Sequence, residues 1–197
     1  MIVNIKKMQQ ENIIRDTKKY IIKVARQLFS EYGYLGVSMS DIAKKLNITK
    51  AALYYHFTGK AEIYKSVLDE VFSNLSLSLR EAFYEKTAEE KIRKLIRNYL
   101  DFGFKEKNLI NALVFKLSPS NSQIRRHIIT LRERIAGLIQ PLVEEALINK
   151  NSTKGIDSRL ITSLLTGMMD GLILEYSFLN KKMNPIEISD QIIAILF

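Results

Sequence analysis

The sequence predicts an all-α protein of about nine helices. Only three prolines and eight glycines interrupt its 197 residues, and so few helix-breaking residues favour long helices over many short strands. Apolar residues recur every three or four positions along most of the chain, which is the spacing of one helical face. We find no segment with the two-residue alternation of a half-buried strand, no internal repeat and no low-complexity tract.

The first predicted helix begins near Arg15 and ends at Gly33, because glycine readily adopts the left-handed backbone of a helix end. Residues 1–14 are mostly polar, and we expect them to be frayed or loosely helical. The apolar face of this helix consists of Ile21, Ile22, Ala25, Leu28 and Phe29.

Two short helices joined by a tight turn come next. Ser38 can cap the first of them, and Asp41 three residues later forms an imperfect capping box with it. Asn47 suits the turn because it tolerates a left-handed backbone. Thr49 can cap the second short helix, which continues to about His56. This pattern is the sequence form of a helix-turn-helix, which places its second helix in the major groove of DNA.

The rest of the chain predicts longer helices. The fourth begins near Gly59 or Lys60 and runs to about Glu85. Thr87 followed by Glu90 is a capping pattern for the fifth. Further helices are expected at about residues 109–117, from 122 onward, at 157–180 and at 185–197. Pro141 cannot donate a hydrogen bond to the carbonyl of Gly137, so we expect a kink or local break there.

Positive charge is concentrated at the N-terminal end. The formal net charge is +9, and residues 1–60 hold 11 Lys and Arg against 4 Asp and Glu, whereas residues 61–197 hold 19 against 17. A basic end beside a near-neutral body indicates a polyanionic partner at that end. The simpler alternative is that a lysine-rich surface only keeps the protein soluble.

Several classes of function are disfavoured by composition. The chain has no cysteine, which excludes disulfides, thiolate metal sites and cysteine nucleophiles. No Gly-rich phosphate loop and no Glu-x-x-His pair is present, so we expect no catalytic residue, no metal and no cofactor. The first residues do not form a signal peptide, and Asp170 and Glu175 interrupt the most apolar window. We therefore expect a cytoplasmic protein that does not bind membranes.

The helix-turn-helix and its flanks resemble the tetracycline-repressor (TetR) family of bacterial transcription regulators. The resemblance covers about residues 15–65 and is carried by an ordered series: Ala25, Leu28-Phe29, Gly33-Tyr34, Ser40-Asp41-Ile42-Ala43, Leu53-Tyr54-Tyr55-His56-Phe57 and Lys60. Met169-Asp170-Gly171-Leu172 is similar to a turn of the family's eighth helix. The chain departs from the family at Ala51, where glycine is frequent, and at Gly59, where a serine cap is usual.

The resemblance implies a division into two domains. Residues 1–60 are expected to form a three-helix DNA-binding head that contains the helix-turn-helix. Residues 61–197 are expected to form a helical body that binds a ligand and dimerises.

The recognition helix is expected to extend from Thr49 to His56. Its first turn faces the groove, so Thr49, Lys50 and Ala52 are placed to meet bases or flanking phosphates. A lysine can donate to guanine O6 or N7, and the Ala52 methyl can pack on a thymine methyl. The resemblance implies that Tyr54 points at a phosphate and that Tyr55 lies on the DNA-facing edge, the alternative being that one of them is core.

Other polar groups can hold the DNA backbone. Ser38 and Ser40 lie at the start of the second helix and can bind one phosphate, and Lys60 can bind another. His56, at a helix end, is more plausible as a capping or phosphate-contacting group than as a metal ligand. Lys44 and Lys45 add charge on the second helix, or simply form a solvated face.

The body carries the expected dimer and ligand sites. The last two helices hold more apolar residues than a monomer surface allows, and a pair from each subunit would make a four-helix interface. The same residues could instead be intramolecular core. The resemblance places a mainly apolar ligand cavity between the fifth to eighth helices, with candidate lining residues Tyr99, Phe102, Phe104, Phe115, His127, Met168, Met169 and Tyr176.

The leading hypothesis is a dimeric repressor that binds a palindromic operator and is released by a small hydrophobic effector. A DNA-binding or partner-binding regulator without a ligand is the main alternative. An enzyme with an accessory helix-turn-helix is a remote one.

Overall fold

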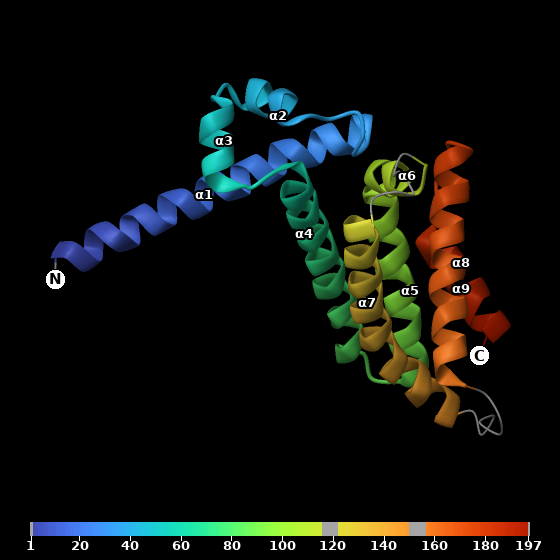
Figure 1. Cartoon of the computed structure of the whole chain (residues 1–197). Helices are drawn as coiled ribbons and strands as arrows, with labels where there is room; N and C mark the ends of the chain where they lie inside the picture. Colours follow the sequence, from blue (N-terminus) through green and yellow to red (C-terminus); the bar gives the residue numbers. More distant parts are fainter. Residues whose placement is uncertain (1, 116–121, 150–156, 197) are drawn as a thin grey trace. The chain divides into compact units, whose positions relative to one another are not determined.

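Figure 1 shows the computed structural model, in which the backbone of residues 2–115, 122–149 and 157–196 is described. These residues form nine α-helices and one short 3₁₀ helix with no strand among them, which confirms the all-α prediction. In chain order the elements are α1 (Ile2–Tyr32), α2 (Met39–Leu46), α3 (Lys50–His56), α4 (Lys60–Arg80), η1 (Glu81–Tyr84), α5 (Ala88–Lys105), α6 (Lys107–Phe115), α7 (Ser122–Asn149), α8 (Ser158–Phe178) and α9 (Pro185–Leu196).

The helices group into two compact units. The first, which we call the head unit, joins residues 1–70 with residues 111–125, and the second, the body unit, joins residues 71–110 with residues 126–197. Helix α4 therefore begins in the head unit and ends in the body unit. The predicted domain boundary between residues 60 and 61 remains a prediction about which parts fold on their own.

The first helix is longer than predicted. It begins at Ile2 rather than near Arg15, and it ends at Tyr32, where Gly33 takes the left-handed backbone with φ 71°. The polar residues before Arg15 contain neither proline nor glycine, so nothing in them stops a helix that has already formed.

The head unit has an aromatic core where α1 meets α4. The ring of Tyr64 packs edge-on to Phe29 with centroids 4.8 Å apart, and it lies 4.9 Å from the ring of Tyr34. All three side chains are buried. Pairs of aromatic rings at these distances stabilise a core beyond the area they bury, so this cluster fixes α4 against the end of α1.

The body unit is a helical bundle around one apolar core. Thr87 caps α5 in a full capping box with Glu90, as the sequence predicts. Helices α5 and α8 approach closely at Gly103, where an added Cβ would lie 2.1 Å from Cδ1 of Ile173. A side chain at Gly103 would therefore require the buried end of the Ile173 side chain to move.

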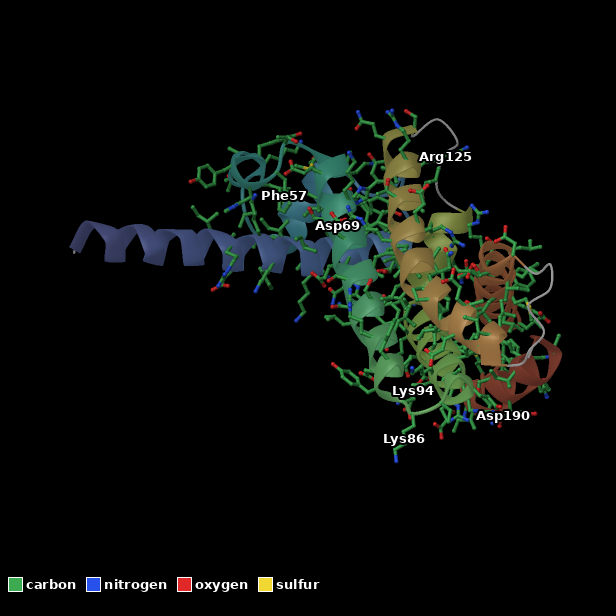
Figure 2. The ribbon with its side chains drawn as sticks, turned by 90° about the horizontal axis from the view of Figure 1, so that it is seen from below. Phe57, Asp69, Lys86, Lys94, Arg125 and Asp190 are labelled. Carbon is green, nitrogen blue, oxygen red and sulfur yellow. The ribbon has the colours of Figure 1, made fainter. Side chains whose placement is uncertain are left out.

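Polar contacts fasten the ends of the body helices. Arg93 and Arg97 of α5 both contact Asp190 of α9, which is labelled in Figure 2. Lys91 of α5 lies 2.8 Å from a carboxylate oxygen of Glu145 on α7. These half-buried pairs tie α5 to α7 and α9.

Helix α7 continues through Pro141 without interruption, so the predicted local break is wrong, whereas a kink at the proline stays a prediction. Ile139, Leu142 and Val143 are almost completely buried around the proline, and their packing holds the helix together. Gly137 and Pro141 lie on the exposed side. The carbonyl that loses its partner can therefore bind water.

None of the helices in the described part of the chain is long and apolar enough to cross a membrane.

Candidate nucleic-acid interface

The helix-turn-helix is built by the caps that the sequence predicts. The hydroxyl of Ser38 accepts from the backbone N–H of Asp41 at 3.2 Å, and the Asp41 carboxylate accepts from the Ser38 backbone N–H at 2.8 Å. Asn47 takes the left-handed conformation, with φ 54° and ψ 42°. Thr49 caps α3 by accepting from the N–H of Ala52 at 3.1 Å. Figure 1 shows α2 and α3 as the resulting two short helices joined by a tight turn.

One apolar side chain anchors the recognition helix. Leu53 is fully buried, and Phe57, labelled in Figure 2, is 3% exposed just after α3 ends. Lys50 and Ala52 are exposed, and so is Thr49 before them. Because a single face of α3 is held by the core, the first turn is left available to a partner.

Tyr54 and Tyr55 are 52% and 70% exposed. The alternative that one of them belongs to the core is therefore wrong for this chain.

His56 lies half-buried at the end of α3. Its ring meets that of Tyr55 edge-on, with centroids 5.1 Å apart. Its Nδ1 is buried and has no hydrogen-bond partner among the described residues. Only its other ring nitrogen, Nε2, is left for an external group.

Asp41 lies among the cations of the head. Hydrogen bonds from the Ser38 hydroxyl and backbone N–H hold the pKa of Asp41 below its usual range, and the nearby charges of Lys44 and Lys50 lower it further. Lys44, Lys45 and Lys50 are all exposed. The structure therefore brings Lys50, from α3, near the capped start of α2, where Ser38 is exposed and Ser40 half-buried.

Lys60 has an internal contact that the sequence did not predict. Its Nζ donates to the backbone carbonyl of Tyr34 at 2.8 Å and lies 4.3 Å from the centre of the Tyr34 ring. Burial lowers the pKa of Lys60, which the nearby charge of Asp41 partly opposes. The ammonium thus ties the start of α4 to the end of α1, and its other N–H groups remain for a second acceptor.

Thr58 and Glu62 close the turn at the start of α4, beside Gly59, where the family usually has a serine cap. The backbone N–H and the hydroxyl of Thr58 both donate to Oε2 of Glu62, at 2.6 and 2.7 Å. These hydrogen bonds hold the pKa of Glu62 below its usual value. The sequence signal was present, since a threonine stands four residues before a glutamate at a helix start, but it lies outside the usual capping-box spacing.

The candidate ligand residues are distributed over the body core and its edge. Tyr99 and Met169 are buried, whereas Phe102, Met168 and Tyr176 are half-buried and pack against the same core. Phe104 and His127 are also half-buried. The side chain of Phe115 lies outside the described residues. No three His, Cys, Asp or Glu side chains in the described ranges are grouped so that they could hold a metal ion.

Two family models match the chain. The model described as bacterial regulatory proteins, tetR family, matches residues 21–67. The model described as tetracyclin repressor-like, C-terminal domain, matches residues 85–197, which is more than half of the chain.

Curated relatives cover most of the chain or only its head. The nucleoid occlusion factor SlmA of Vibrio atlanticus is 25% identical over 175 residues, which are 88% of this chain and 89% of that protein. The negative transcriptional regulator IcaR of the biofilm operon icaADBC from Staphylococcus epidermidis is 48% identical over 56 residues, which are 28% of this chain and 30% of that protein.

Solved structures share the fold along nearly the whole chain. The transcriptional regulator FadR of Bacillus subtilis, in complex with stearoyl-CoA, superimposes with a TM-score of 0.77 at 22% identity, covering 89% of this chain and 95% of that chain. AibR, in complex with isovaleryl coenzyme A and operator DNA, superimposes with a TM-score of 0.71 at 19% identity, covering 91% of this chain and 97% of that chain.

Proposed function

The chain belongs to the TetR family of bacterial regulatory proteins, and from this premise we propose that it is a ligand-released repressor. It binds a palindromic operator as a dimer and leaves the operator when a small hydrophobic effector binds its body. The observation that carries the proposal is the exposed face of α3, which a single buried residue, Leu53, holds outward.

The proposed contacts divide between bases and the DNA backbone. Lys50 and Ala52 face the major groove, where a methyl group can pack on thymine and a lysine can donate to guanine or neutralise a flanking phosphate. The remaining residues position the head on phosphates, which sets register rather than sequence. The complete proposed set is Ser38, Ser40, Thr49, Lys50, Ala52, Tyr54, Tyr55, His56 and Lys60.

Two of these proposed contacts are constrained by the head itself. Lys60 can bind a phosphate only with the N–H groups that its bond to Tyr34 leaves over. His56 can reach one only through Nε2, since its Nδ1 is enclosed.

A homodimer through α8 and α9 suits a palindromic site, because one recognition helix reads too few bases to be selective. The outer face of α8 supports this proposal, since Leu160 and Leu164 are 57% and 47% exposed. Gly167 and Gly171 lie on the same face, and an added Cβ at either position would meet nothing within 4 Å. A second helix could therefore approach this face closely.

The proposed effector is an acyl compound. FadR and AibR, which share this fold, are described in complex with stearoyl-CoA and isovaleryl coenzyme A. The body supplies apolar residues for an acyl chain, among them Met168, Met169 and Tyr176. Methionine side chains adapt to ligands of different shape because they are unbranched and flexible.

Release requires that the effector bind one conformation of the dimer more tightly than the other. Helix α4 is the proposed link, because it begins in the head unit and ends in the body unit. The contacts of Lys60 and Tyr64 with the end of α1 would carry a movement of α4 into the head.

A mobility-shift assay with the DNA upstream of the gene for this chain tests the proposal. The wild type is expected to shift the DNA, and the double variant Lys50→Ala/Tyr55→Ala is expected not to. Tyr84→Ala/Lys86→Ala is a matched control, because it removes an exposed tyrosine and an exposed lysine from the body. An unaltered shift with the first double variant would contradict the proposed interface.

The effector is tested on the same complex. Stearoyl-CoA and isovaleryl-CoA, added separately, are expected to release the DNA if the effector is an acyl compound. Retention of the DNA with both would reject the acyl proposal and favour the alternative below.

A regulator without a small ligand is the second candidate, since one of the relatives similar over most of the chain, SlmA, is described as a nucleoid occlusion factor and its name includes no ligand. Its distinguishing result is operator binding that persists across a panel of acyl compounds of different length and headgroup.

A further inference from the structure

Three helices of the body meet at a polar cluster that we call the Tyr-Asp-Arg cluster. The hydroxyl of Tyr99 on α5 donates to Oδ1 of Asp170 on α8 at 2.7 Å. The other oxygen, Oδ2, lies 2.7 Å from Nη1 of Arg132 on α7. A single carboxylate therefore joins α5, α7 and α8.

The cluster runs from the core to the surface. Tyr99 is 7% exposed, whereas the side chains of Asp170 and Arg132 are 28% and 51% exposed. Burial, and then the charge of Asp170, raise the pKa of Tyr99 well above its usual value, so the phenol remains a donor to the carboxylate. The guanidinium thus stands at the open end and the phenol at the closed end.

Arg132 has more hydrogen-bonding capacity than this ion pair uses. A guanidinium carries five N–H donors in a planar fork that matches a carboxylate or a phosphate. The ion pair engages Nη1, and half of the side-chain surface stays exposed. Because half of the Arg132 side chain is open to solvent, another anion can approach the guanidinium and exchange with Asp170 there.

The surroundings favour an anion with an apolar tail. Between residues 126 and 134, helix α7 carries Arg126, Arg132 and Arg134 against the single acid Glu133. Next to Asp170 on α8, Met169 is buried and Met168 is half-buried against the body core. Of these arginines, Arg132 is the one that contacts the cluster, and the two methionines adjoin Asp170 in the chain.

We propose that Arg132 recognises the anionic headgroup of an amphipathic effector and that the headgroup competes with Asp170 for it. The inference rests on the proposed effector-released function and names the chemistry that the effector must carry. A carboxylate and a phosphate, such as those of a free fatty acid and an acyl-CoA, share this chemistry. Asp170 would keep its bond from Tyr99 after the exchange, so no buried charge would be left without a partner.

The exchange also supplies a route to the dimer face. While Arg132 binds Asp170, it ties α7 to α8. A headgroup that takes Arg132 releases this tie from α8, the helix that also carries the exposed residues Leu164, Gly167 and Gly171. The effector would then favour the conformation in which the tie is open.

Binding of three probes of equal chain length tests the proposal by titration calorimetry. Dodecanoate and dodecyl phosphate are the two anionic probes, and dodecanol is the neutral one. The wild type is expected to bind at least one anionic probe about 10-fold or more tightly than dodecanol, and the preferred anion identifies the headgroup. Arg132→Gln is expected to reduce this preference to about twofold or less while leaving dodecanol binding unchanged.

Two further variants separate recognition from folding. Arg134→Gln removes a neighbouring exposed arginine of α7 and is expected to keep the full anion preference. Asp170→Asn removes the competing charge and is expected to tighten binding of the preferred anion several-fold.

Three results would overturn the inference. The first is that the wild type binds charged and neutral probes equally well. The second is that Arg132→Gln weakens binding of the anionic and the neutral probes by the same factor. The third is that Arg132→Gln keeps the full preference for the anion. Operator binding, measured separately on the wild type, keeps this inference distinct from the proposed function. If the protein shifts the operator but does not discriminate between the probes, only the headgroup inference is rejected. If it discriminates between the probes but binds no operator, the repressor proposal is rejected.

Discussion

Replacing Lys50 with alanine removes an exposed cation from the first turn of each recognition helix. The backbone of α3 should be unaffected, because Thr49 still caps it and Leu53 still anchors it. Alanine is also the best helix former, so no loss of helix is expected. Any change in operator binding therefore reports the contact of Lys50 itself.

The expected magnitude follows from counterion release. Each neutralised phosphate contributes about 0.9 to the slope of log affinity against log salt concentration, so a dimer that loses Lys50 twice should lose about 1.8. When the salt concentration rises from 50 to 200 mM, both proteins lose affinity for the operator. With a slope lower by about 1.8, the variant loses about 12-fold less affinity than the wild type over this range. The charge of Asp41 adds to the effect at low salt, because Lys50 no longer offsets it.

Fluorescence anisotropy of a labelled operator over a series of salt concentrations measures both the affinity and the slope. Lys86→Ala in the body removes one exposed lysine and serves as the control for net charge. A slope equal to that of the wild type in Lys50→Ala would refute a phosphate contact. If Lys50→Ala lowers the affinity for the operator but leaves the salt slope unchanged, Lys50 contacts a base edge without neutralising a phosphate.

Four further results are expected. Leu53→Ala should lower the free energy of unfolding of the head by about 3 kcal/mol in urea titrations followed by circular dichroism, whereas Leu53→Met should cost less than about 1.5 kcal/mol. Gly103→Ala should lower the free energy of unfolding by about 1–3 kcal/mol because its Cβ meets Cδ1 of Ile173. Adding Ile173→Val should recover part of that loss, and additive effects of the two substitutions would contradict the contact. The pKa of Asp41 is lowered in the folded head, so the Asp41 carboxylate stabilises the fold above the ordinary carboxyl range and stops doing so as the pH falls through the folded pKa. Asp41→Asn should therefore reduce the difference between the urea midpoints measured at pH 7 and at pH 3. Gly171→Arg should leave the helix content unchanged, because a side chain there has open space in one copy, but should shift sedimentation toward the monomer if α8 pairs with a second copy.

Local sequence determined the secondary structure of the head almost completely. Ser38 with Asp41, Asn47 and Thr49 act through hydrogen bonds and backbone preferences within a few residues, and the structure has each of them in its predicted role. Interactions of this range can be recognised from sequence because both partners lie in the same short window.

Predictions that depended on distant parts of the chain were less complete. Helix α7 continues through Pro141 because the residues around the proline are buried by other helices, and no local rule contains that packing. The polar residues before Arg15 gave no apolar stripe from which to start α1, although nothing in them interrupts the helix.

The sequence alone determined that the chain is all-α and that a basic helix-turn-helix stands at its N-terminal end, since periodicity, caps and charge are local properties. Only the tertiary structure decided that Tyr54 and Tyr55 are both exposed, that Lys60 binds the carbonyl of Tyr34, and that Tyr99, Asp170 and Arg132 meet. Exposure and contacts between residues far apart in sequence are set by how the helices pack, and that packing is the sum of many weak contacts that no single segment encodes.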